Sequence, residues 1–70
     1  MPKFYSSLSI TKILLVNGFD FVSQKGIHQK YRKIGNPTLT VIIPADRKQI
    51  PMGTFRSILR QSGLSEDDFE

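Results

Sequence analysis

The chain contains no cysteine and no tryptophan, and His28 is its single histidine. Without cysteine, the protein can form neither a disulfide framework nor a thiolate metal site. One histidine also leaves too few ligands for zinc, which takes three or four converging side chains, so we expect no metal and no other cofactor. The sequence further lacks the glycine-rich phosphate loops of P-loop and dinucleotide-binding proteins, which argues against those classes.

Long apolar runs are missing as well. No stretch approaches the ~18 apolar residues of a membrane span. The lysine near the N-terminus is followed by Ser6 and Ser7 rather than by the apolar segment of a signal peptide. The lack of cysteine suits a reducing compartment. We therefore expect a cytoplasmic protein without a membrane anchor.

Acidic residues are scarce outside the C-terminus. Four of the six acids lie within residues 66–70, so residues 1–65 carry ten basic side chains and two acidic ones, a net charge of +8. A small body with this excess favours a polyanionic partner, nucleic acid first. The alternative is a basic surface that serves only solubility.

Seventy residues make one domain with a small core. We expect this domain to span residues 1–70, with residues 1–8 as a polar leader and residues 65–70 as a short acidic helix. Acidic side chains in the first turn of that helix suit the helix dipole.

Two amphipathic helices are predicted from apolar residues spaced at i, i+3 and i+4. The first begins near Ser9, a favourable N-cap residue, and ends at Asn17-Gly18, where Gly18 can take the left-handed conformation. The second spans Met52 to Ser62 and ends at Gly63. The expected core-facing residues are Ile10, Ile13 and Leu14 in the first helix and Phe55, Ile58 and Leu59 in the second.

Between the helices, residues 19–24, 28–33 and 38–43 have the composition of strands. The turns at Lys25-Gly26 and at residues 34–37 are short, so the strands should form an antiparallel meander. The order α-β-β-β-α predicts an α+β fold, in which two helices cover one face of a three-stranded antiparallel sheet. The other face of the sheet would be open.

The segment 24–33 joins the single histidine to a dense group of basic residues. At the two-residue period of a strand, His28, Lys30 and Arg32 share one face, whereas Gln29, Tyr31 and Lys33 share the other. Histidine is the side chain that most readily exchanges a proton near neutrality, so His28 could act as a general acid or base. A surface histidine without a chemical role is the alternative.

A second basic group follows the last strand and includes Arg47, Lys48, Arg56 and Arg60. Gly53 and Thr54 lie near a helix start, where backbone N–H groups can hold a phosphate. Ordinary capping and solvated arginines explain the same residues. Tyr31 could stack on a base or pack against a neighbour.

Two segments resemble one known family. Gln24-Lys25-Gly26-Ile27-His28 resembles the QKGSH signature of HicA-type toxins, the messenger-RNA interferases of bacterial and archaeal toxin–antitoxin pairs. The segment 53–65 resembles the family's GTLRSILRQAGLS segment almost throughout and is the more specific of the two. Asn17-Gly18-Phe19 also fits the family's junction between helix and strand, and the resemblance extends over residues 8–69.

Three positions depart from the family pattern. Ile27 stands where the family usually has a serine, and Gln29 replaces a frequent second histidine. Ala45-Asp46 stands where many members carry another histidine. These departures leave His28 as the single candidate for proton transfer.

The resemblance implies a fold like that of a double-stranded-RNA-binding domain and ribonuclease activity without metal, with His28 as the catalytic residue. It also implies a HicB-type antitoxin that covers the site, so that the chain is monomeric when free and hetero-oligomeric with the antitoxin. Together with the charge pattern, it gives the following expected RNA-binding residues: Lys25, Gly26, Lys30, Arg32, Lys33, Arg47, Lys48 and Arg56.

Our hypothesis is cleavage of messenger RNA by transesterification, with His28 as the base and nearby cations stabilising the phosphoryl charge. The alternatives are a non-catalytic RNA-binding module of the same fold and an inactive toxin copy. A weaker alternative is a DNA-reading helix-turn-helix over residues 52–69, which the acidic final helix disfavours because it would face phosphates.

Overall fold

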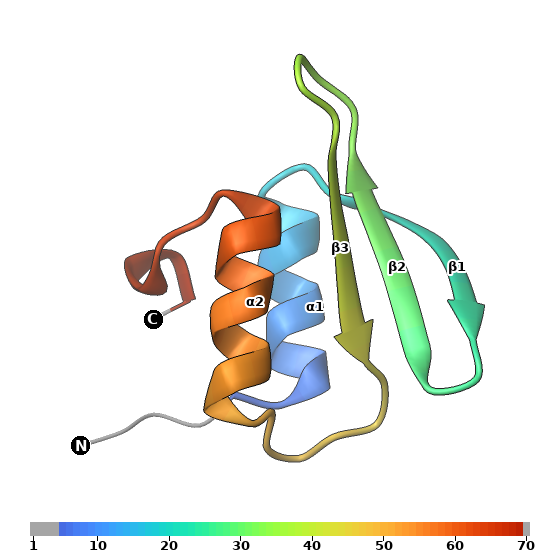
Figure 1. The fold of residues 1–70 in the computed structure, drawn as a ribbon, viewed down its shortest axis with the longest axis vertical. Coiled ribbons are helices and arrows are strands. Elements are labelled where there is room, and N and C mark those ends of the chain that lie inside the picture. Colours follow the sequence, from blue (N-terminus) through green and yellow to red (C-terminus); the bar gives the residue numbers. More distant parts are fainter. Residues whose placement is uncertain (1–4, 70) are drawn as a thin grey trace.

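The computed structural model describes residues 5–69. The elements in chain order are α1 (Ser7–Val16), β1 (Asp20–Lys25), β2 (His28–Lys33), β3 (Leu39–Pro44), α2 (Met52–Ser62) and the 3-10 helix η1 (Glu66–Phe69) (Figure 1). The strands form one antiparallel sheet in the order β1-β2-β3. The predicted α-β-β-β-α fold with an open three-stranded sheet is confirmed.

The N-cap of helix α1 (Ser7–Val16) lies three residues earlier than the sequence predicts. Its N-cap is Ser6, whose hydroxyl accepts a hydrogen bond from the backbone N–H of Ser9 at 3.1 Å. The prediction of Ser9 as the cap is therefore wrong, because the Ser6 hydroxyl accepts a hydrogen bond from a free N–H group at the start of the helix and Ser9 lies inside it. The prediction of residues 1–8 as a leader is wrong for Ser7 and Leu8, which are helical. Residues 1–4 of the expected leader lie outside the described residues.

The β1–β2 hairpin turns through Gly26 and Ile27 rather than through Lys25-Gly26. Lys25 is the last residue of β1 and pairs with His28, the first residue of β2. Of the two turn residues only Gly26 has a positive φ, 61°. This is the pattern of a type II′ turn, which has glycine at its first central position. Strand β1 also begins one residue later than predicted and carries a bulge between Phe21 and Ser23.

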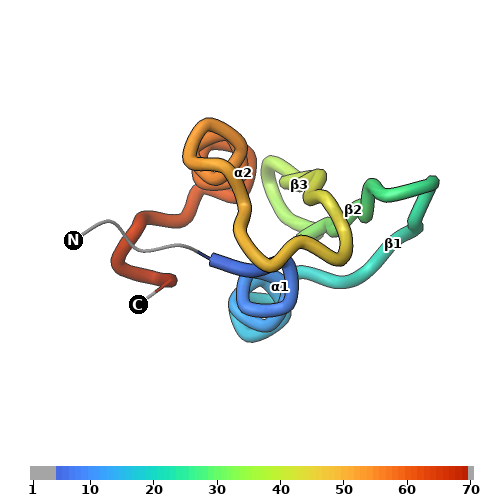
Figure 2. The backbone as a smooth tube through the Cα atoms, turned by 90° about the horizontal axis from the view of Figure 1, so that it is seen from below, coloured from blue at the N-terminus to red at the C-terminus, as the bar shows by residue number. Residues whose placement is uncertain are grey.

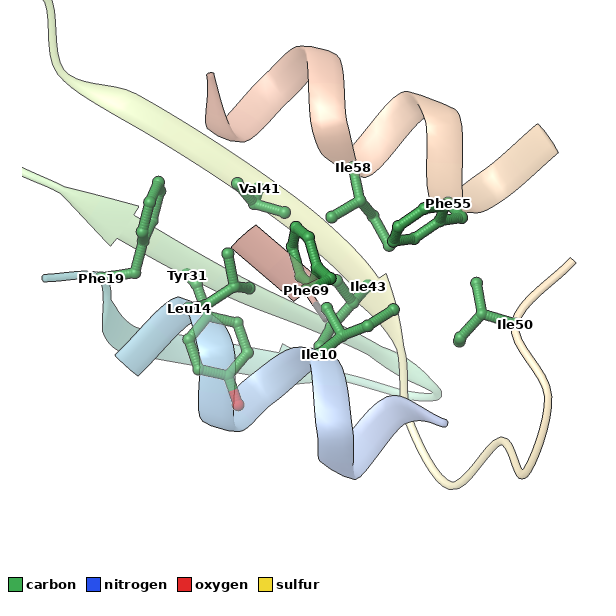
Figure 3. Close-up of a cluster of buried hydrophobic side chains, with 10 residues drawn as sticks. All are labelled: Ile10, Leu14, Phe19, Tyr31, Val41, Ile43, Ile50, Phe55, Ile58 and Phe69. Carbon is green, nitrogen blue, oxygen red and sulfur yellow. The ribbon is translucent and has the colours of Figure 1, made fainter. Parts of the chain in front are cut away.

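The core lies between the sheet, α1 and α2 (Figure 3). Seen along the helices, α1 lies beneath the sheet and α2 runs along its β3 side (Figure 2). On β3, Val41 and Ile43 are fully buried, and Leu39 packs at the margin. The ten buried residues of this cluster are Ile10, Leu14, Phe19, Tyr31, Val41, Ile43, Ile50, Phe55, Ile58 and Phe69.

Phe69 anchors the 3-10 helix η1 to the core. This ring is buried and meets Phe55 edge-to-face, with 5.3 Å between ring centroids. The Asp68 carboxylate accepts hydrogen bonds from the backbone N–H of Ser65 at 2.8 Å and from its hydroxyl at 3.1 Å. The acidic helix expected over residues 65–70 is a single 3-10 turn over Glu66–Phe69. Glu70 lies outside the described residues.

Candidate functional site

His28, Lys30 and Arg32 lie on the open face of the sheet. The opposite face of β2 is fixed by Tyr31, whose ring is buried in the core and meets Phe21 edge-to-face at 5.6 Å between centroids. Since successive side chains of a strand alternate, the even-numbered residues of β2 point away from the helices. We call Lys25, His28, Lys30 and Arg32 the basic row.

The antiparallel register adds neighbours to this row. Directly opposed residues of antiparallel strands share a face, and Lys25 opposes His28 across the β1–β2 ladder. On the other flank, β3 places Pro44 opposite His28 and Ile42 opposite Lys30. His28 therefore lies between a cation and a small apolar side chain at one end of the sheet.

The basic row is accessible to a large ligand. His28 and Lys25 are exposed, whereas Lys30 and Arg32 are half-buried. Asp20 is the only acidic residue of the three strands, and it opposes Arg32 at the far end from His28. The positive field is therefore strongest around Lys25, His28 and Lys30, where a phosphate group would be held beside the imidazole.

Four of the predicted RNA-binding residues do not join the basic row, and two of them, Arg47 and Lys48, lie in the loop after β3. Lys33 extends on the helix side of the sheet, where its ammonium lies 6.0 Å from the centre of the Phe19 ring. Arg56 is exposed on α2, which packs against β3. Gly26, in contrast, lies in the turn directly between Lys25 and His28.

Tyr31 does not present a ring for base stacking, because the side chain is only 3% exposed. The alternative interpretation, packing against a neighbour, is the correct one. Its hydroxyl reaches the side of α1 (Figure 3) and lies 3.4 Å from the Thr11 hydroxyl and 3.3 Å from Oε1 of Gln29. Tyr31 thus connects the core to the surface between β2 and α1.

A second feature is a pocket of about 520 Å³ at that surface. It lies between the first turn of α1, the helix-facing side of β2 and the loop after β3. Arg47 and Lys48, both predicted to bind RNA, line it together with Asp46. The full lining is Ser6, Ser7, Leu8, Thr11, Gln29, Tyr31, Asp46, Arg47 and Lys48.

The sequence did not predict this pocket. Except for Thr11, its α1 wall falls in the segment expected to be a polar leader. Its loop wall is joined to α1 by Ser7. The Ser7 hydroxyl donates to the Pro44 carbonyl at 2.6 Å and accepts from the Arg47 N–H at 2.9 Å. A run of serines at positions 6, 7 and 9 was the available signal, since such residues often cap helices.

Among residues 5–69, no three His, Cys, Asp or Glu side chains gather as metal ligands would. None of the described helices is both long and apolar enough to cross a bilayer. The chemical groups offered to a ligand are the His28 imidazole, which can exchange a proton, and the cations of the basic row. This combination suits a phosphodiester, whose charge the cations could stabilise.

The fold places the chain in a structural class, that of small α-β-β-β-α proteins resembling double-stranded-RNA-binding domains. The comparisons identify the family. The family model for the HicA toxin of bacterial toxin–antitoxin systems matches residues 9–64, most of the chain, and the chain belongs to this family. It is a toxin of a toxin–antitoxin system, and an antitoxin partner follows from that membership. No curated protein matches the chain significantly.

Proposed function

We propose that this toxin is a metal-independent endoribonuclease that cuts messenger RNA, with His28 as its general acid and base. One observation carries the proposal. An exposed histidine stands on the open sheet face with Lys25 directly opposite and Lys30 two residues further along the same strand face. Proton transfer and charge stabilisation are thereby available within one short stretch of surface.

The proposed reaction is an internal transesterification. The neutral imidazole of His28 takes the proton of a ribose 2′-hydroxyl, and the 2′ oxygen attacks the adjacent phosphorus. The bond from phosphorus to the 5′ oxygen breaks, and the leaving oxygen, on the opposite side of the phosphorus, takes a proton from a water molecule. The His28 imidazolium returns its proton to that water, which restores the neutral imidazole. The products are a 2′,3′-cyclic phosphate and a free 5′-hydroxyl, and no oxidant or cofactor enters the balance.

The cations of the basic row have separate parts in this proposal. Lys25 and Lys30 flank His28 and would stabilise the charge on the two non-bridging oxygens of the reacting phosphate. Arg32, two residues beyond Lys30, would hold the next phosphate of the strand. Arg47, Lys48, Lys33 and Arg56 lie outside the row and would contribute attraction for the RNA rather than catalysis.

We also propose that a HicB-like antitoxin inhibits the toxin by covering the basic row. The free chain would be a monomer and the inhibited form a hetero-oligomer. This arrangement fits the open sheet face, because nothing from residues 5–69 covers it and a partner could bury His28 without rearranging the fold. The active site would then be released as the antitoxin is removed.

The test is cleavage of a single-stranded RNA by the purified chain in EDTA. We expect cuts with 5′-hydroxyl and cyclic phosphate ends, and a fall of about 10²–10⁴-fold in rate for His28→Ala. Arg60→Gln, an exposed arginine of α2, is the control and should retain the parent rate. Equal cleavage by the parent and His28→Ala would overturn the proposal. RNA bound but left intact by the parent would favour a non-catalytic RNA-binding module.

A further inference from the structure

We propose that the pocket beside α1 binds one nucleotide of the RNA strand that is cut at His28, as a subsite separate from the basic row. The inference rests on the proposed function for the identity of its ligand. It differs in place, because Gln29 and Tyr31 face the pocket while His28 faces the other side of the sheet. The subsite would let the protein read a nucleotide beside the cleavage position.

The pocket has a suitable size and lining for a nucleotide. Its volume of about 520 Å³ is within the range typical of small-molecule sites. Leu8, which is 67% exposed, gives one apolar wall against which the flat face of a base can lie. The pocket is open on one side, as a site for part of a longer chain must be.

The floor of the pocket carries hydrogen-bonding groups that are only weakly engaged. The Tyr31 hydroxyl is shared between Thr11 at 3.4 Å and Gln29 at 3.3 Å, both longer than the usual O–H···O distance of up to about 3.0 Å. The Gln29 amide in turn donates to Gln24 at 3.2 Å. A base edge could therefore exchange partners with this chain of groups at little cost, since hydroxyls and amides both donate and accept.

The rim of the pocket supplies positive charge for a phosphate. Arg47 and Lys48 are exposed side chains of the loop that follows β3. Asp46 lies on the same rim and offsets one of the two charges, so the rim is net positive by one. Cationic donors of this kind make the stronger hydrogen bonds to phosphate oxygens.

The pocket is held in shape before any ligand binds. Besides the two hydrogen bonds of its hydroxyl, Ser7 donates its backbone N–H to the Arg47 carbonyl at 2.9 Å. These three bonds join the end of β3 and the loop after it to the first turn of α1. Asp46 has a φ of 56°, a left-handed conformation that Asp tolerates better than most residues. A preformed site loses less free energy on binding than a flexible one.

An RNA strand can pass from the basic row to the pocket around the end of the β-sheet. His28 pairs with Pro44, and the pocket loop begins two residues after Pro44. Between the two faces lie the Gly26–Ile27 turn and Ala45, joined by a hydrogen bond of 2.6 Å from the Ala45 N–H to the Ile27 carbonyl. Ile27 is 61% exposed at this turn and offers an apolar contact to the RNA strand.

The experiment maps the binding of adenosine, guanosine, cytidine and uridine 5′-monophosphates on the His28→Ala chain by amide chemical shifts. We expect at least one nucleotide to shift the amides of residues 6–11, 29–31 and 46–48. Its affinity should fall roughly tenfold or more in the Arg47→Gln, Lys48→Gln double variant, which loses two charge-assisted hydrogen bonds. The control is Lys12→Gln with Arg60→Gln, which removes the same charges elsewhere and should change affinity less than about twofold.

Further measurements test the pocket itself. Tyr31→Phe removes only the floor hydroxyl and should weaken the nucleotide but not inorganic phosphate. Shifts confined to the basic row, or an equal response to nucleotide and inorganic phosphate, would overturn the inference. The inference would also be overturned if the antitoxin protected the pocket amides and no nucleotide did. The pocket would then be a protein interface.

Failure of this inference can be distinguished from failure of the proposed function. Nucleotide bound in the pocket by a chain that does not cut RNA would contradict the ribonuclease proposal and leave the subsite standing. Cleavage dependent on His28, with nucleotide shifts only along the basic row, would do the reverse. The double variant should also change which sequences are cut, as seen by mapping the 5′-hydroxyl ends.

Discussion

At the scale of single residues, His28 and Gln29 are neighbours in the chain that face opposite sides of the sheet. The positions that depart from the family pattern lie at the pocket or in the turn beside it. Gln29 and Asp46 line the pocket, and Ile27 lies in the turn that joins the pocket to the basic row. We therefore expect these departures to alter how a strand is held beside α1, and to leave the surroundings of His28 intact.

Ser7 is the residue on which the pocket depends most. It is 6% exposed, and its hydroxyl bonds both the Pro44 carbonyl and the Arg47 N–H. Ser7→Ala should lower the free energy of unfolding by about 1–3 kcal/mol, because it leaves part-buried backbone groups without a partner. Denaturant unfolding measures this loss.

Ser9→Ala is the matched control for that substitution. Ser9 is exposed, and within residues 5–69 its hydroxyl bonds the Ser6 hydroxyl alone, at 2.7 Å. Its replacement should change the free energy of unfolding by no more than ~0.5 kcal/mol. Equal losses in the free energy of unfolding for the two variants would mean that the hydrogen bonds of the Ser7 hydroxyl add no specific stability.

At the scale of elements, the sequence predicted the bounds of β2 and α2 correctly and missed the start of α1. Residues 52–62 show the helical period clearly and are bounded by Pro51 and Gly63. At the N-terminus, three serines could each have served as the cap. The choice of Ser6 comes with contacts from Ser7 to residues about forty positions away, which local pattern does not reveal.

The β1–β2 hairpin gives a prediction at the same scale. Gly26 has a φ of 61° and open space around its Cα, so a side chain there would be strained by the backbone alone. Gly26→Ala should lower the free energy of unfolding by ~1–2 kcal/mol, whereas Gly26→Asn should recover part of the loss.

Gly53→Ala is the control for the hairpin variants. Gly53 lies in α2, also with open space around it, and its φ is not positive. Alanine there should leave stability unchanged or raise it by up to ~1 kcal/mol. Both free energies come from chemical denaturation, and a stable Gly26→Ala chain would contradict the type II′ assignment.

At the scale of the whole molecule, strand period predicted the shared face of His28, Lys30 and Arg32, but neither the place of Lys25 opposite His28 nor the pocket. Lys25 was expected in the turn, and the hairpin register that brings it into the row is a finding of the structure. Lys33 was already expected on the other face by the same rule, and the structure places it beside Phe19. The pocket needs α1, β2 and a loop together, and their mutual placement depends on tertiary packing that no local pattern contains.

The net charge of the body predicts strong salt dependence of RNA binding. If the basic row and the pocket rim together contact three to four phosphates, the affinity of the His28→Ala chain for single-stranded RNA should fall about 20- to 50-fold between 50 and 200 mM salt. Lys30→Gln should reduce the slope of log affinity against log salt by ~0.7, and Arg60→Gln should not. Fluorescence anisotropy measures both, and a salt-independent affinity would rule out phosphate contacts as the main attraction.

The central claim is that this toxin acts on RNA through His28, and expression of the parent and His28→Ala in the same cells tests it most directly. His28→Ala should fold as stably as the parent, because His28 is exposed and outside the core. We predict that the parent arrests growth and fragments messenger RNA, whereas His28→Ala does neither. Arrest with fragmented RNA at the same level for His28→Ala would contradict the account.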